Sequence, residues 1–237
     1  MNKFQTLSIP ISIDSSPYEA FKRQTHKGSL NQIRSRYIKA RRLLDFFIAF
    51  IGLILSLPVF FIIGILIKTT SRGPVFYAQE RVGKDGRIFE IIKFRTMSVD
   101  AESLLGPVWA KKNDVRITNL GRILRRTHID ELPQLFNVIR GEMSIIGPRP
   151  ERPHFVDMLN KEISGYAGRL TTKPGITGLA QSYHGYDETI RDVQKKLRYD
   201  MLYIKRMCLA LDIKIILQTL RVSISRGKWK KKNVNKG

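Results

Sequence analysis

The longest apolar stretch of the chain runs from Phe46 to Ile67, 22 consecutive residues without a charge. A helix of this length can cross the hydrocarbon core of a bilayer, which is about 30 Å thick. Pro58 lies near its middle, lacks a backbone N–H and clashes with the preceding turn, so we expect a strong kink there. The pattern therefore predicts a membrane-inserted helix that is broken at Pro58.

Basic residues flank this segment on both sides: Arg34, Arg36, Lys39, Arg41 and Arg42 before it, and Lys68 and Arg72 after it. Because positive residues prefer the cytoplasmic side of a membrane, the flanks favour a re-entrant hairpin that returns to the face from which it started. An ordinary kinked transmembrane helix stays open, since proline is tolerated in spanning helices. Asp45 is expected to pair with Arg41 or Arg42 at the interface.

Beyond the apolar segment, residues 75–97 alternate in the way that predicts two strands, with a turn at 84–86. The alternation places Lys93 and Arg95 on one face of the second strand.

Helical patterns occupy most of the remaining chain. A short basic helix is expected at 121–126 and another at 130–139, ended by Gly141. Residues 189–205 form an amphipathic pattern with a basic face, which suits a core-packed helix or, modestly better, one lying in the membrane interface. The fold class is therefore α+β and mainly helical, with a Pro-broken membrane helix for which the flanks favour a re-entrant path and spanning stays open, interfacial amphipathic helices and a small β-hairpin.

Charge and composition divide the chain into four parts: a mobile basic arm at 1–33, the membrane helix with its flanks at 34–72, a cytosolic catalytic domain at 73–225, and a basic tail at 226–237. The chain has 42 Lys and Arg against 20 Asp and Glu, a net charge of +22. Such an excess implies an anionic partner, which can be nucleic acid, anionic lipid or a phosphorylated substrate.

Candidate chemistry centres on the neighbouring carboxylates Asp130 and Glu131. Asp130 is a good helix N-cap, and Pro133 falls in the first turn of the expected helix. A carboxylate there meets the positive end of the helix dipole and stays ionised. An ionised carboxylate can attack phosphorus and form an acyl phosphate. The alternative is that Asp130 only caps a helix.

Phosphoryl transfer also needs cations around the phosphate oxygens. Candidates near in sequence or on the expected hairpin are Lys93, Arg95, Arg125, Arg126, Arg149 and Arg152, and we include Glu151 from the same Pro-rich loop in the substrate site. Mg²⁺ is the natural ion for a pyrophosphate held by carboxylates, with Asp130 and Glu131 as its ligands.

Asp200 lies at the edge of the apolar stripe of the amphipathic helix, so it is expected to be partly desolvated. It either bonds Arg198 or Arg206, or it orients an arginine or a metal ion near a phosphate site.

Four motifs now combine: GPVFYAQERVG at 73–83, KFRTM at 93–97, IDELPQLFNVIRGEMSIIGPRP at 129–150 and KPGITGLAQ at 173–181. With them the chain resembles the monotopic phosphoglycosyl transferases, bacterial sugar transferases that prime exopolysaccharide, capsule and glycan assembly. The resemblance extends from about Arg41 to Leu220. One departure is that Leu57 precedes the helix-breaking Pro58, where the family often has Ser.

The resemblance implies that Asp130 is a nucleophile that forms a covalent phosphosugar with release of UMP, that Glu131 is a base in the second half-reaction, and that Mg²⁺ is required. It places Lys93, Arg125, Arg149 and Asp200 around the phosphates. It also implies a UDP-sugar donor, with glucose or galactose favoured by the string GPRPERPHF, and a polyprenyl phosphate acceptor.

The same resemblance implies a re-entrant helix with both ends cytosolic, in the bacterial cytoplasmic membrane. Anionic inner-leaflet lipid, a second copy of the chain and downstream glycosyltransferases are the further partners expected.

Two rival functions remain: a membrane-tethered nucleic-acid-binding protein and a basic membrane scaffold. The first would need aromatic residues interleaved with a basic groove, or a known nucleic-acid fold. Neither is visible in the sequence, so no nucleic-acid partner is expected.

Overall fold

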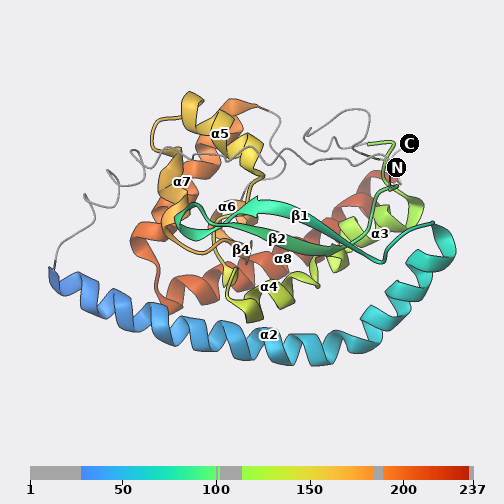
Figure 1. Cartoon of the computed structure of the whole chain (residues 1–237), viewed down its shortest axis with the longest axis horizontal. Coiled ribbons are helices and arrows are strands. Elements are labelled where there is room, and N and C mark those ends of the chain that lie inside the picture. Colours follow the sequence, from blue (N-terminus) through green and yellow to red (C-terminus); the bar gives the residue numbers. More distant parts are fainter. Residues whose placement is uncertain (1–27, 100, 102–113, 184–188, 235–237) are drawn as a thin grey trace, which may run out of the picture.

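A computed structural model describes residues 28–99, 101, 114–183 and 189–234 (Figure 1). The first described element is α2 (Gly28–Thr70), a helix of 43 residues. It curves along one side of the molecule, and the other elements lie on its concave side (Figure 1). Most of the expected arm at 1–33 and part of the expected tail at 226–237 lie outside the described residues, so these boundaries stay predictions.

Pro58 lies inside α2, and the helix continues across it. The expected break is therefore a curve within one helix rather than an interruption (Figure 1). The hydroxyl of Ser56, which is buried, donates to Leu53 O at 3.0 Å one turn before the proline. Residues 36–70 are the one described segment that is long and apolar enough to cross a membrane, and only 22% of its most apolar window is buried.

The predicted hairpin is confirmed. Strands β1 (Phe76–Val82) and β2 (Ile88–Phe94) pair antiparallel, with Phe76 opposite Phe94 and Val82 opposite Ile88. A short 3₁₀ turn, η1 (Lys84–Gly86), joins them. Phe94 packs with Ile63 and Ile67 of α2, so the hairpin lies directly against the second half of the long helix.

Three short helices follow. Helix α3 (Asn119–Thr127) is capped by Thr118, whose hydroxyl accepts from Gly121 N at 2.9 Å. A single 3₁₀ turn, η2 (Ile129–Glu131), leads into α4 (Gln134–Arg140). As predicted, α4 ends at Gly141, which is left-handed with φ 84°.

A second, parallel pair of strands is formed by β3 (Ser144–Ile146) and β4 (Gly175–Thr177). Between them the chain forms α5 (Pro153–Glu162) and a 3₁₀ segment, η3 (Tyr166–Thr171). Helix α6 (Leu179–Tyr183) comes after β4. A Cβ atom at Gly175 would overlap the backbone of Gly147 and of Thr177. The end of β3 and the start of β4 therefore lie at a distance that only glycine permits.

The amphipathic helix predicted at 189–205 is confirmed as α7 (Ile190–Arg206). Val193 and Leu197 are buried on its inner face, whereas Arg198 is exposed. Helix α8 (Leu209–Val234) follows and has exposed apolar side chains at Leu209, Ile213, Leu217 and Leu220.

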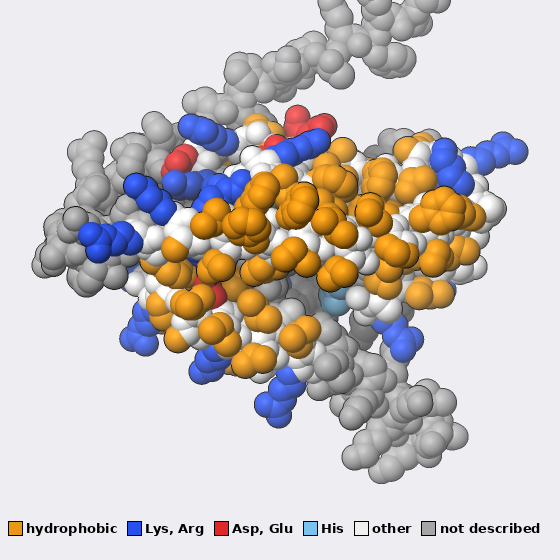
Figure 2. All heavy atoms as spheres, turned by 90° about the horizontal axis from the view of Figure 1, so that it is seen from below, with side chains coloured by type: hydrophobic (Ala, Val, Ile, Leu, Met, Phe, Trp, Pro, Cys, Tyr) orange, Lys and Arg blue, Asp and Glu red, His pale blue; other side chains and the backbone are white. Residues whose placement is uncertain are grey.

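Seen from the side along which α2 runs, the surface is a broad apolar band with Lys and Arg side chains at its margins (Figure 2). Together with the elements above, this confirms a mainly helical α+β fold with a long apolar helix and a small hairpin. Which way the helix passes through a membrane stays a prediction.

Buried polar contacts fasten the first half of α2 to the domain. Asp45 accepts from Ser144 Oγ at 2.7 Å and from Ile145 N at 3.1 Å, so its expected pairing with Arg41 or Arg42 is wrong. The reason is that β3 brings a hydroxyl and a free backbone N–H to this face of the helix. Arg41 bonds the same hydroxyl at 2.6 Å, and Arg42 donates to the last carbonyls of α4.

Candidate active site

Asp130 and Glu131 lie in η2, between α3 and α4. His128 adopts the left-handed conformation with φ 59°, which ends α3 and turns the chain into η2. The helix that follows has Pro133 at its N-cap and no side-chain capping bond. The expected capping role of Asp130 is therefore wrong, because a 3₁₀ turn separates it from the helix start.

The Asp130 carboxyl group points into the protein. The residue is 6% exposed, and its Oδ1 atom is buried with no hydrogen-bond partner among the described residues. Buried polar atoms are nearly always hydrogen-bonded, so an unpartnered carboxylate oxygen marks a position of functional interest.

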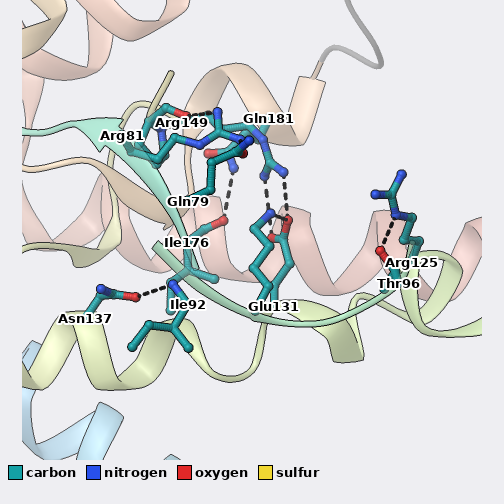
Figure 3. Close-up of polar contacts among 12 residues, drawn as sticks. Gln79, Arg81, Ile92, Thr96, Arg125, Glu131, Asn137, Arg149, Ile176 and Gln181 are labelled. Carbon is teal, nitrogen blue, oxygen red and sulfur yellow. Dashed lines mark hydrogen bonds and ion pairs between the residues drawn. The ribbon is translucent and has the colours of Figure 1, made fainter. Parts of the chain in front are cut away.

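Glu131, in contrast, is bonded to two cations. Lys93 Nζ lies 2.9 Å from Glu131 Oε1. Arg149 Nη2 lies 2.7 Å from the same oxygen (Figure 3). Lys93 comes from β2, and Arg149 comes from the loop after β3. Three candidates that are far apart in sequence thus meet at one point.

The two neighbouring carboxyl groups have opposite pKa shifts. Burial, and then the charge of Glu131, raises the pKa of Asp130, although Lys93 and Arg125 oppose the shift. The net shift of this pKa is upward, whereas the expected helix dipole alone would lower it. Burial also acts to raise the pKa of Glu131, but Arg149 and Lys93 outweigh it and hold this pKa well below its usual value. Environments that separate the pKa values of two adjacent acids are typical of catalytic pairs.

A third cation is close to the dyad of Asp130 and Glu131: this is Arg125, which lies to the right of Glu131 in Figure 3. Its Nε donates to Thr96 Oγ1 at 2.8 Å, which fixes the side chain at the end of β2. Its charge lowers the pKa of Asp130, so it acts on the dyad through space.

Arg95 is not part of this group. It is buried and donates to the backbone carbonyls of Ser71 and Arg72, where α2 ends. The expectation that it joins Lys93 at the phosphates is not supported, because the chain after α2 passes over this face of the strand and takes its donors.

The remaining candidates come from the loop 147–151 and from the start of α5. Glu151 lies 3.8 Å from Arg81 Nη1 on β1, and its charge also acts on Arg149. Arg152 occupies the N-cap position of α5. Arg149 is the member of this loop that reaches Glu131.

Asp200 is 2% exposed, which confirms the expected desolvation. Its partner is Arg169 of η3, at 2.9 Å, and not Arg198 or Arg206. The expected partners are wrong because Asp200 faces inward from α7 onto η3. Asp200, Arg149 and Glu151 line one cavity, and Arg149 also bonds Glu131.

Sequence reasoning missed Arg81 and Arg169. Each bonds the 147–151 loop from a distant part of the chain, at 3.1 Å to Pro150 O and 2.9 Å to Arg149 O respectively. No local pattern marks either residue, since their partners are separated by 69 and 20 positions.

Among the described residues no cluster of three or more His, Cys, Asp or Glu side chains could hold a metal ion. The donor set of the dyad itself is limited to the unpartnered Asp130 and the paired Glu131. That set suits an ion held mainly by substrate phosphates, which is how Mg²⁺ is commonly bound.

Comparison with known proteins agrees with the resemblance seen in the sequence. The model of the family described as bacterial sugar transferase matches residues 36–226. A UDP-N-acetylgalactosamine-undecaprenyl-phosphate N-acetylgalactosaminephosphotransferase of Aeromonas hydrophila is 42% identical over 84% of this chain and 48% of its own length.

Two further relatives are named for other sugars. A UDP-glucose:undecaprenyl-phosphate glucose-1-phosphate transferase of Klebsiella pneumoniae is 43% identical over 76% of this chain and 39% of its own. Galactosyl transferase CpsE of Streptococcus agalactiae is 38% identical over 82% of this chain and 44% of its own. The chain thus spans about half the length of these relatives or less. The family match and the identities confirm that this chain belongs to the bacterial sugar transferase family.

Proposed function

We propose that the chain transfers a hexose-1-phosphate from a UDP-sugar to polyprenyl phosphate, through an aspartyl-phosphosugar intermediate. The observation that carries this proposal is the buried, unpartnered Oδ1 of Asp130 beside a Glu131 that is bonded to two cations. A nucleophile without competing hydrogen bonds next to phosphate-binding cations suits attack on a pyrophosphate. The names of the relatives support the donor and acceptor classes.

In the first half-reaction an Asp130 oxygen attacks the phosphorus that bears the sugar. The bond from that phosphorus to the bridging oxygen breaks, and UMP leaves with the electron pair. In the second, an oxygen of polyprenyl phosphate attacks the same phosphorus and the Asp130–phosphorus bond breaks, which restores the carboxylate. The product is a polyprenyl diphosphate sugar.

Lys93 and Arg149 supply the positive charge that the phosphate oxygens need. Arg149 is the more accessible, with 45% of its side chain exposed against 18% for Lys93. When substrate phosphates share these cations, Glu131 loses part of the interaction that keeps its pKa low. Its basicity then rises, which fits a role as proton acceptor for the lipid phosphate in the second half-reaction.

Mg²⁺ is part of this proposal. Asp130 and Glu131, with the phosphates of the donor, would hold it, and when bound it neutralises charge on the pyrophosphate. The buried Asp130 oxygen without a partner is the observation that supports a ligand there.

The proposal extends to the sugar and to the cellular setting. We favour glucose or galactose, although the three relatives above are named for N-acetylgalactosamine, glucose and galactose. The reaction would be the first membrane step of surface polysaccharide synthesis, with the catalytic domain facing the cytosol. Anionic lipid at the basic margins of the apolar face and a second copy of the chain are the further partners proposed.

Asp130→Asn tests the mechanism. The amide keeps the shape of the side chain but is not an anionic nucleophile, so release of UMP from UDP-sugar should fall by about four orders of magnitude or more. A phosphosugar adduct, detected by intact mass on the wild type without acceptor, should be absent from the variant. Because Asp130 caps no helix, the unfolding midpoint should stay near that of the wild type.

Asp157→Asn on α5 is the matched control, and it should keep both activity and adduct. A folded Asp130→Asn protein with near wild-type turnover would exclude Asp130 as nucleophile. A panel of UDP-sugars in the same assay identifies the donor.

A further inference from the structure

The backbone of the 147–151 loop is bonded at every carbonyl from Pro148 to Glu151. The donors are Gly175 N for Pro148 O at 2.9 Å, Arg169 Nη2 for Arg149 O at 2.9 Å, Arg81 Nη1 for Pro150 O at 3.1 Å and Val82 N for Glu151 O at 2.9 Å. Two of these donors are side chains of arginines that reach the loop from other elements. The two prolines further restrict the backbone. The loop that carries Arg149 is therefore held from three sides.

Arg169 makes the most demanding of these contacts. Its guanidinium is 9% exposed and has three partners: the Tyr166 hydroxyl at 2.6 Å, Arg149 O at 2.9 Å and Asp200 Oδ2 at 2.9 Å. The planar fork of arginine can satisfy all three at once, which a lysine cannot. Asp200 fixes the side of the guanidinium that also donates to the loop.

Burying the Arg169–Asp200 ion pair has a large desolvation cost, so the pair contributes little to the stability of the fold. Burial raises the pKa of Asp200 to about 6, even though Arg169 opposes the shift, and Glu151 and Lys196 also face this group. Since this value lies above the ordinary 3.8, ionisation of Asp200 at neutral pH opposes folding, and the group stabilises the fold only as pH falls through about 6. Buried ion pairs of this kind are often no more stabilising than apolar side chains of similar size. The pair is better explained by what Arg169 holds.

We propose that Arg169, fixed by Asp200, is a positioning residue that presets Arg149 on the dyad. The bond from Arg169 to the Arg149 carbonyl fixes the backbone from which the Arg149 side chain extends to Glu131 (Figure 3). Asp200 then acts through two intervening arginines and does not contact substrate. The proposal rests on the proposed function, in which Arg149 meets the donor phosphates.

A double-mutant cycle with Asp200→Asn and Arg149→Lys tests this path. Positioning errors of about 1 Å can slow a reaction by about a hundredfold, so we expect each single change to slow single-turnover UMP release by roughly that factor. If Asp200 acts through Arg149, the double variant should be no more than a few-fold slower than Arg149→Lys alone, because the guanidinium that Asp200 helps to position is already gone. Losses that multiply would mean that Asp200 acts independently, for example by direct substrate contact, and would overturn the proposal.

A second experiment does not depend on catalysis. Replacing the pair by Arg169→Met with Asp200→Leu removes both charges together, so no uncompensated charge is left buried and the protein should still fold, although Tyr166 Oη and Arg149 O lose their partner. Hydrogen exchange at the amides of residues 147–156 should nevertheless accelerate, because Arg149 O has lost its donor. Unchanged exchange in a folded double variant would overturn the proposal even if no UDP-sugar were turned over, and a wild type inactive on every UDP-sugar would refute only the proposed function.

Arg198→Gln, on the exposed face of α7 two residues from Asp200, is the matched control. It should keep wild-type UMP release and wild-type exchange at 147–156. If the apolar pair does not fold, the Asp200→Asn cycle still decides the question, because the amide preserves the shape of the carboxyl group.

Discussion

At the scale of single residues, the site consists of two adjacent carboxyl groups that are treated differently by their surroundings. Asp130 is buried without a hydrogen bond at Oδ1, and its pKa is raised. Glu131 takes both nearby cations and is held ionised. The two residues therefore differ in what they offer: Asp130 has an oxygen without a hydrogen bond, whereas Glu131 binds Lys93 and Arg149.

This difference predicts a pH effect. In the proposed mechanism the reactive form of Asp130 is the carboxylate, and its pKa is raised, so the rate of adduct formation should fall as pH drops through that raised value. Glu131→Gln removes a like charge and frees Lys93 and Arg149 to act on Asp130. Both changes favour the ionised form, so the acidic limb of the profile should move to lower pH, even though the maximal rate falls.

Single-turnover UMP release, measured from pH 5 to 9, checks the shift. Glu162→Gln, an exposed change at the end of α5, should leave the profile in place. If the acidic limb of the pH profile stays at the same pH or moves to higher pH in Glu131→Gln, Glu131 does not hold the pKa of Asp130 up.

The sequence predicted which residues share the site where those residues belong to a motif. It did not predict hydrogen-bond partners that only tertiary packing brings together. The motifs placed Lys93, Arg149 and Glu131 in one group, and the structure brings them into contact. Arg95 belongs to the same KFRTM motif, yet it bonds the end of α2. Arg169 has no local signature, because its partners come from a loop and a helix that only the fold brings together.

At the scale of elements, the close parallel pairing of β3 with β4 determines where the 147–151 loop begins. Gly175 allows the two backbones to approach, and an added Cβ would meet backbone atoms that cannot rotate away. Gly175→Ala should therefore lower the free energy of unfolding by about 1 to 3 kcal/mol or more and displace Arg149, with loss of UMP release.

Gly64→Ala is the contrasting change, because its Cβ would lie 3.8 Å from Val75 in ordinary contact. It should be neutral or slightly stabilising. Chemical denaturation in detergent and the UMP assay test both variants. A Gly175→Ala protein as stable and active as the wild type would show that the close approach of β3 and β4 does not determine the position of the loop.

The long helix α2 makes the second prediction at this scale. Pro58 lacks the N–H that would bond Ile54 O, and α2 curves without a break (Figure 1). Pro58→Leu restores that bond and should straighten the helix, with altered labelling of flanking residues and reduced activity. If labelling and UMP release are both unchanged, the curvature comes from packing of α2 on the domain and not from the proline.

Elements were more predictable than their junctions. The hairpin, α7 and the end of α4 at Gly141 follow from alternation, helical spacing and a glycine stop. The 3₁₀ turn at the dyad was not predicted, because a left-handed His128 is not a choice that composition favours. The partner of Asp45 was missed for a related reason, since a three-residue strand gives too short a pattern to detect.

At the scale of the whole molecule, charge and shape point the same way. All the other elements lie on the concave side of α2, and cations border the apolar face (Figures 1 and 2). If the apolar face is within the bilayer, both ends of α2 remain on the side of the catalytic domain.

Epitope tags beside Asn2 and after Gly237 should therefore both be protected in intact cells and accessible after permeabilisation of the inner membrane. Labelling of one terminus in intact cells would show that the helix spans.

The dyad and the apolar helix are only one layer apart, since Ile129 and Leu135 on either side of the catalytic pair both pack on α2. Under the proposed function, a protein held in this way would meet its lipid acceptor in two dimensions. The concentration that governs the second half-reaction is then the mole fraction of polyprenyl phosphate in the bilayer, not its amount per volume of cytosol. A cell could therefore regulate the pathway by changing how much of the carrier is recycled to this leaflet, with the amount of enzyme and of soluble donor held constant.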